Sequence, residues 1–190
     1  MKTVAVIVGS LSAASLNLKL AKALEKLAAP QLKFKFVEIG DLPMYNNDLW
    51  ANPPAAVTRL KGEIEAADGL LLLTPEFNRS FSAALKNALE WGSRPYGQSS
   101  FGGKPVAITG TSPGVIGTAA AQSQLRSVVS HLDMVLMGQP ELYFQSKPGL
   151  IDANFDVTDE QTRAFLLGFV TRFASWIDQH GTPALAVAAE

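Results

Sequence analysis

Residues 9–17, GSLSAASLN, place several hydroxyl groups directly after the apolar run TVAVIV. Serine hydroxyls and backbone N–H groups between a strand and a helix are donors that bind oxyanions, and Ser10, Ser12 and Ser15 supply three hydroxyls. The patterns GxxxxGK(S/T) and GxGxxG are both absent, which argues against a nucleoside triphosphate and a Rossmann dinucleotide. A monophosphate fits these donors, and a simple helix cap by Ser12 or Ser15 fits them equally well.

A second segment, TPEFNRS at 74–80, offers a different chemistry. Phe77 provides a flat apolar face, Asn78 an amide, and Pro75 a fixed backbone. An aromatic ring system needs such an apolar wall with polar donors at its edge. An ordinary turn is the alternative interpretation, because Pro and Asn are common in turns.

A third segment, GTSPG at 110–114, matches the GxSxG pattern, and Asp178 and His180 follow in the chain order of an α/β-hydrolase triad. The residue after Ser112 is Pro113, which has no N–H for the oxyanion hole that such a hydrolase needs. We therefore interpret this segment as a flexible loop beside a ligand site.

Composition limits the class of protein. A chain of 190 residues with 47% hydrophobic content suits one compact domain, expected at 1–180, with 181–190 as a loose C-terminal tail. A net charge of -1 without charged blocks lacks the footprint of a nucleic-acid binder. With no cysteine and two distant histidines, we expect neither thiolate chemistry nor a metal site. The apolar runs are too short for a signal peptide or membrane span, so we expect a cytoplasmic protein without a membrane partner.

Short apolar runs alternate with segments of helical periodicity, which is typical of βα units around a parallel sheet. Strands are predicted at 3–8, 32–39, 70–74, 105–109 and 135–144. Helices are predicted at 15–28, 55–67, 82–91, 118–132 and 159–180.

The character of the strands indicates their order. VAVIV and LLLL are apolar throughout, as strands covered on both faces are, whereas Lys33 and Lys35 alternate with apolar residues in the second strand. Pro140 cannot donate to a ladder, so the fifth strand also favours an edge. The flavodoxin-like order 2-1-3-4-5, an α/β three-layer sandwich around a five-stranded parallel sheet, satisfies both edges, and the Rossmann order 3-2-1-4-5-6 satisfies them less well. In the first order, ligands bind beyond strands one and three, where GSLSAASLN and TPEFNRS lie.

Four segments, in this order, resemble the NADPH-dependent FMN reductase family, which includes bacterial quinone and chromate reductases. They are GSLSAASLN, LPMYNND at 42–48, TPEFNRSFSAALKNALEWGSRP at 74–95 and GKPVAITGTSPGVIG at 103–117. The similarity covers roughly residues 3 to 145. Its strongest element, TPEFNRSFSAALKNALEW, resembles the TPEYN…LKNAIDW segment of the family.

The resemblance implies a bound FMN and assigns residues to its two ends. The 5′-phosphate is expected at Ser10, Ser15 and Asn17 in the first loop. The isoalloxazine ring is expected against the third-strand and fourth-strand loops, at Pro75, Glu76, Phe77, Asn78, Ser112 and Gly114.

Two positions depart from the family pattern. Ser12 stands where the family often has an arginine (GSLR), so a cationic phosphate contact is missing, and Phe77 replaces a frequent tyrosine. We hypothesise that Arg79, close by in sequence, partly supplies the missing charge or contacts the nicotinamide nucleotide.

The resemblance also implies the chemistry and the assembly. NADPH or NADH passes a hydride to the flavin, and a quinone or similar small molecule, such as chromate, an azo compound or free flavin, takes the electrons. No catalytic side chain is required. A homodimer or homotetramer is expected, with 42–48 and 91–101 as interface elements.

Two alternatives stay open on the residues alone. One is a flavodoxin-type electron carrier without nicotinamide activity, although such carriers are strongly acidic and this chain has a net charge of -1. The other is a non-redox binding or hydrolytic protein.

Overall fold

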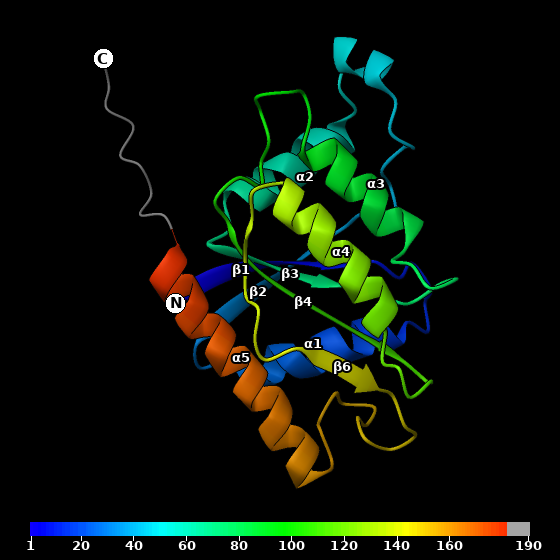
Figure 1. The fold of residues 1–190 in the computed structure, drawn as a ribbon, viewed down its shortest axis with the longest axis vertical. Helices are drawn as coiled ribbons and strands as arrows, with labels where there is room; N and C mark the ends of the chain where they lie inside the picture. Colours follow the sequence, from blue (N-terminus) through cyan, green and yellow to red (C-terminus); the bar gives the residue numbers. More distant parts are fainter. Residues whose placement is uncertain (182–190) are drawn as a thin grey trace.

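In the computed structural model, which describes residues 1–181, a parallel β-sheet forms the middle layer (Figure 1). Its order is β2-β1-β3-β4-β5, with β6 also paired to β4, and every strand pair is parallel. The strands are β1 (Lys2–Val8), β2 (Leu32–Val37), β3 (Gly69–Leu73), β4 (Pro105–Ser112), β5 (Val135–Leu136) and β6 (Leu142–Gln145). The predicted order 2-1-3-4-5 is confirmed, and both predicted edge positions hold.

The prediction of one continuous strand at 135–144 is wrong. β5 pairs with the beginning of β4, where Val135 lies opposite Pro105, and β6 pairs with its end, where Leu142 lies opposite Thr109. Pro140 lies between the two short strands and has no N–H to give to the ladder. Two short strands, β5 and β6, therefore pair with the same edge of β4, one after the other.

Helices cover both faces of the sheet (Figure 1). α1 (Leu16–Ala28) and α5 (Glu160–His180) share one core cluster with Val4 and Val6 of β1. α2 (Ala55–Glu65), α3 (Ala83–Gly92) and α4 (Ala119–His131) share the other with Ala5 and Ile7. Because successive side chains of a strand point to opposite faces, a strand apolar throughout serves both layers.

Four helices begin one residue later than predicted, and in three of them the first predicted residue is a side-chain cap. The side chains of Ser15, Ser82 and Asp159 accept hydrogen bonds from backbone N–H groups within the first turns of α1, α3 and α5. A short 3₁₀ helix, η1 (Asn47–Ala51), was not predicted; it projects at one end of the molecule, in cyan in Figure 1.

None of the helices within residues 1–181 combines the length and apolarity needed to cross a membrane. The loose tail expected at 181–190 falls almost entirely outside the described residues and stays a prediction.

Candidate cofactor site

Three loops meet beyond the carboxyl ends of β1, β3 and β4, and two glycines allow them to approach closely. A Cβ on Gly9, directly after β1, would lie 2.5 Å from the hydroxyl of Ser82, which caps α3. A Cβ on Gly110 would collide with the carbonyl oxygen of Thr74, directly after β3. The sequence thus keeps side chains away from both contacts, and the loops lie together at the switch point of the sheet, where such folds bind ligands in a crevice.

The first loop combines a helix cap with open donors. Ser15 is buried, and its Oγ accepts the N–H of Leu18 at 3.0 Å, so the cap interpretation is confirmed. Its own hydroxyl hydrogen is still available. Ser12 is exposed and Ser10 half-buried, and among the hydrogen bonds of residues 1–181 none uses the N–H of Ser12, Ala13 or Ala14. The cap and an anion site are therefore compatible in this loop.

Asn17 connects the first loop to the fourth strand. It is 2% exposed; its Nδ2 donates to the carbonyl of Thr111 at 3.1 Å, and its Oδ1 accepts the N–H of Thr111 at 3.0 Å. β3 ends at Leu73, opposite Thr109, so Thr111 has no strand residue beside it on this side. The amide takes the place of a peptide group in the ladder. The resemblance assigned Asn17 to the phosphate, but these contacts make it a positioning residue with one amide hydrogen left for a ligand.

The β3 loop forms a small hairpin. Phe77 and Ser80 exchange two backbone hydrogen bonds of 3.0 Å around Asn78 and Arg79, which have φ angles of 52° and 66°. Positive φ at both central residues is the mark of a type I′ turn. The turn interpretation of this segment is therefore confirmed. Phe77, at the base of the turn, is 59% exposed.

Glu76 fixes this hairpin to α4. Its carboxylate is 10% exposed, and Oε2 accepts the N–H groups of Ala120 and Ala121 at 3.1 and 3.2 Å. Thr118, the residue before α4, has a φ of 71° and makes no side-chain cap. Glu76 therefore supplies the missing cap and places a negative charge at the positive end of the helix.

Arg79 pairs with Glu76, its Nη1 lying 3.3 Å from Oε1. No contact of the described residues joins its guanidinium to the first loop, so the structure does not place it beside the serines there. Gln124 of α4 makes two further hydrogen bonds to the hairpin. It donates to the carbonyl of Arg79 at 2.9 Å and accepts from the Ser80 hydroxyl at 2.7 Å. Sequence reasoning missed both α4 contacts.

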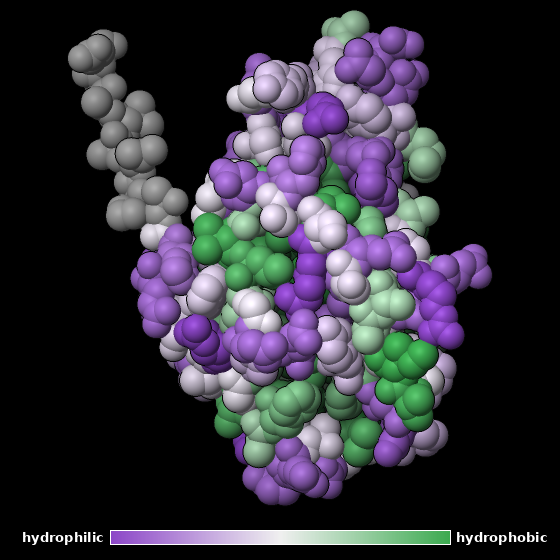
Figure 2. Space-filling view, viewed as in Figure 1, coloured by the Kyte–Doolittle hydropathy of each residue, from purple (hydrophilic) through white to green (hydrophobic). Residues whose placement is uncertain are grey.

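The β4 loop contributes apolar surface. Ser112 is the last residue of β4, and its hydroxyl donates to the carbonyl of Gly114 at 3.2 Å. Val115 is 83% exposed and Ile116 also exposed; Figure 2 shows apolar surface where this loop emerges near the beginning of α4. Beside the crevice, the described chain thus presents a nonpolar rim.

The structure does not bring together the three residues of the hydrolase alternative. Asp178, near the end of α5, lines a hollow together with Met1 and Lys2, at the start of β1. Ser112 lies at the carboxyl end of β4. Asp178 and Ser112 therefore lie at opposite ends of the parallel strands. His180 packs against Trp176 with tilted rings, 4.0 Å between the ring centroids. No triad is assembled among these residues.

The two segments expected at a subunit interface are each held on the chain by buried residues and leave other residues exposed. Trp91 and Phe101 are fully buried, so they are core residues. Asn87 and Trp91 both donate to the carbonyl of Pro43, at 2.9 and 2.8 Å, which holds the 42–48 segment on α3. Tyr96, by contrast, is 97% exposed.

The donor set fits FMN. A flavin phosphate needs several N–H and hydroxyl donors, which the first loop keeps open, and a flavin ring needs polar groups along one edge, where the N–H groups of Glu76 and Asn78 have no partner among the described residues. Gly9 and Gly110 let the loops that carry these donors pack closely together.

An open parallel α/β sheet with these loops at its switch point defines a flavodoxin-like domain. The chain belongs to the NADPH-dependent FMN reductase family, whose model matches residues 2–149. It is accordingly an FMN-dependent oxidoreductase that uses NAD(P)H, as the sequence predicted.

Characterised relatives agree over nearly the whole chain. It is 51% identical over 174 residues to a 2-hydroxy-1,4-benzoquinone reductase of a Burkholderia species, covering 92% of this chain and 95% of that protein. It is 48% identical over 176 residues to a quinone reductase of Pseudomonas putida, covering 92% and 94%. The structure of FerB, a flavoenzyme NAD(P)H:(acceptor) oxidoreductase from Paracoccus denitrificans, superposes with a TM-score of 0.94 at 53% identity, covering 96% and 100%.

Proposed function

We propose that this chain reduces quinones with electrons from NADPH or NADH, through FMN bound in the three-loop crevice. The observation that carries the proposal is the set of groups on the three loops: open N–H and hydroxyl donors on the β1 loop and exposed apolar side chains on the β3 and β4 loops. The names of the relatives at about 50% identity support a quinone as acceptor.

Each loop has its own task in this proposal. Ser10, Ser12 and Ser15, with the N–H groups between them, bind the phosphate. Pro75 and Phe77 form the wall for the ring, and the remaining groups of the β3 and β4 loops lie along its edge: Glu76, Asn78, Ser112 and Gly114. Glu76 acts mainly by holding the hairpin on α4.

The bound flavin supplies the redox chemistry, accepting a hydride from the nicotinamide and delivering electrons to the acceptor. The residues of this chain bind, orient and partly shield it, so no side chain needs to exchange a proton. This agrees with a crevice that has no assembled triad among the described residues.

The acceptor meets an apolar rim. Phe77, Val115 and Ile116 are all exposed beside the crevice. A flat, partly apolar quinone gains contact with such a rim, whereas an anionic acceptor such as chromate gains nothing from these apolar side chains. Azo compounds and free flavin are further flat acceptors that the same rim admits.

Arg79 belongs to the co-substrate side of the proposal. Its guanidinium is exposed and lies on the turn at the mouth of the crevice, held by one oxygen of Glu76. An arginine there suits the phosphates of the nicotinamide dinucleotide. Arg79→Ala should weaken NADPH binding and leave FMN affinity unchanged; unchanged affinity for both ligands would remove Arg79 from the site.

We also propose a homodimer or homotetramer in the cytoplasm. Met44 and Tyr96 are exposed on neighbouring projecting segments that are anchored through Trp91, and exposed large side chains on anchored loops suit a subunit contact. The lack of cysteine is consistent with the compartment.

The test is anaerobic oxidation of NADPH and of NADH by the FMN-loaded protein with a benzoquinone as acceptor. The proposal expects sustained oxidation that depends on both FMN and quinone. An electron carrier would hold FMN and accept electrons from a chemical reductant without oxidising the nicotinamide. A protein that fails to bind FMN at all would contradict the whole assignment.

A further inference from the structure

A second hollow lies beside the first loop, on the side away from β3. Its volume is about 560 Å³, and its walls include Ser10, Leu11, Ser12, Phe36, Glu38 and Gly40. The sheet order β2-β1-β3 puts it between the carboxyl ends of β2 and β1, whereas the FMN crevice lies between β1, β3 and β4. No residue of the β3 or β4 loops lines it. The volume lies within the roughly 300–1,000 Å³ typical of small-molecule sites.

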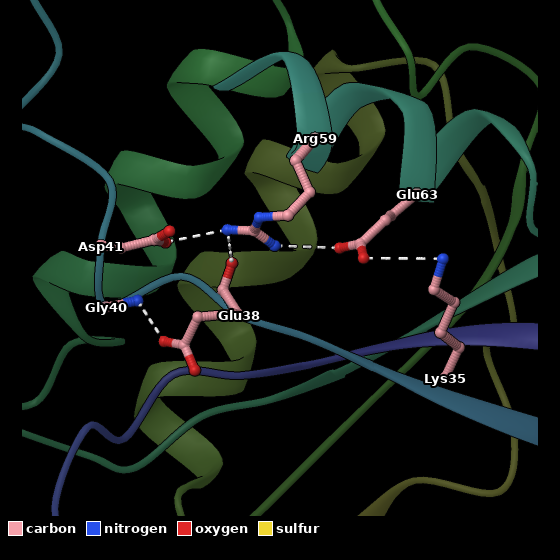
Figure 3. A network of polar contacts seen from close by, with 6 residues as sticks. All are labelled: Lys35, Glu38, Gly40, Asp41, Arg59 and Glu63. Carbon is pink, nitrogen blue, oxygen red and sulfur yellow. Dashed lines mark hydrogen bonds and ion pairs between the residues drawn. The ribbon is translucent and has the colours of Figure 1, made fainter. Parts of the chain in front are cut away.

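Glu38 is the charged residue of this hollow; every other lining side chain is neutral. Its Oε1 accepts the N–H of Gly40 at 2.7 Å, which folds the carboxylate back over the end of β2 (Figure 3). Its second oxygen has no partner among the described residues. A carboxylate fixed in this way presents an acceptor for ligand hydroxyl groups.

The cations nearby are engaged elsewhere. Arg59 of α2 donates to the carbonyl of Glu38 at 3.0 Å and pairs with Asp41 and Glu63 at 2.8 and 3.0 Å (Figure 3). These contacts anchor the segment after β2 without neutralising the Glu38 carboxylate. Lys22 lies over the Phe36 ring, and its ammonium pairs with Glu25 at 3.0 Å. The hollow therefore has a rigid wall and a net negative charge.

The rest of the wall suits a nucleoside. Leu11 and Leu18 are exposed and provide apolar surface for a purine face. Ser12, where the family often has an arginine, keeps the wall between the hollow and the first loop small and uncharged. Glu38 directly follows β2, next to the predicted phosphate loop. A carboxylate there can accept hydrogen bonds from the two neighbouring hydroxyls of a ribose.

We propose that this hollow binds the adenosine end of the reduced nicotinamide dinucleotide, with Glu38 accepting hydrogen bonds from the 2′- and 3′-hydroxyls of its ribose. This assignment rests on the proposed function and deepens it. A 2′-phosphate would bring two further negative charges to the Glu38 carboxylate, with no free cation in the wall to offset them. The chain therefore prefers NADH to NADPH.

The test is equilibrium binding of ADP-ribose, which lacks the nicotinamide, to the FMN-loaded protein by calorimetry. Glu38→Gln keeps an oxygen for the N–H of Gly40 and replaces the open carboxylate oxygen by an amide. Glu38→Gln should weaken ADP-ribose binding about tenfold. It should also reduce the difference in affinity between ADP-ribose and ADP-ribose 2′-phosphate. Glu160→Gln is the matched control, because it makes the same change at an 86% exposed side chain of α5 outside the hollow; ADP-ribose binding should stay unchanged.

Steady-state kinetics separate the outcomes. The ratio of kcat/KM for NADH to that for NADPH should fall in Glu38→Gln and stay constant in Glu160→Gln. If 5′-AMP binding depends on Glu38 while that ratio does not change, the hollow takes a free nucleotide and the dinucleotide assignment is overturned. If quinone reduction proceeds but neither ADP-ribose binding nor the ratio responds to Glu38→Gln, this inference fails while the proposed function stands.

Discussion

The amide of Asn17 gives the sharpest test of how the site is assembled. Asn17→Ala removes two hydrogen bonds and leaves the N–H and the carbonyl of Thr111 buried without partners on that side. Each unsatisfied buried group costs about 1–3 kcal/mol, so with two such groups the free energy of unfolding should fall by about 2–6 kcal/mol. Affinity for FMN should fall as well, because the first and fourth loops are no longer tied together.

Urea unfolding of the FMN-free protein measures the first effect, and flavin fluorescence titration the second. Asn52→Ala is the matched control; it removes the same side chain from an exposed position and should change stability by less than about 0.5 kcal/mol. A loss below about 1 kcal/mol in Asn17→Ala would refute the view that this amide replaces a peptide group in the ladder.

Three further predictions concern the same framework. Gly9→Ala pushes a Cβ against the Ser82 hydroxyl and should lower the free energy of unfolding by about 2–4 kcal/mol, through overpacking and a lost helix cap. In urea unfolding, the double variant with Ser82→Ala should lose about 1 kcal/mol less than the sum of the two single variants. Additive losses would contradict the contact. Ser12→Arg should tighten FMN binding about tenfold at low salt; unchanged titrations would mean that the loop needs no cation. Hydrogen bonds from the hydroxyl and N–H of Thr162 lower the pKa of Asp159, so its stabilising effect is present at neutral pH and lost as pH falls through the lowered value. The difference in thermal midpoint between wild type and Asp159→Asn should shrink on acidification, and a constant difference would be evidence against it.

Local patterns in the sequence were sufficient for the sheet and the helices. Strands apolar throughout, such as VAVIV, are covered on both faces, and Lys33 and Lys35 are exposed on edge strand β2. These properties depend on each strand alone, which is why they predicted the order and hence the switch point. Ser15 was readable as a cap for the same reason, since a cap acts within one turn of its helix.

The side-chain contacts that assemble the crevice were not readable. Asn17 meets Thr111 across 94 residues of sequence, and Glu76 meets Ala120 across 44. In each case a distant side chain satisfies backbone groups that lack a nearby partner. Asn17 bonds to Thr111 beyond the end of β3, and Glu76 caps α4, where Thr118 makes no side-chain cap. Backbone groups without a partner can be identified only once the neighbouring elements are in place. The resemblance named both residues, but for contacts with the flavin.

The most direct test of the central claim compares FMN with riboflavin, which lacks the phosphate, in fluorescence titrations of the FMN-free protein. If the first loop binds the phosphate with two or more charge-assisted hydrogen bonds, FMN should bind about 100-fold more tightly or better. Equal affinity for the two flavins would contradict the assignment of GSLSAASLN as the phosphate site.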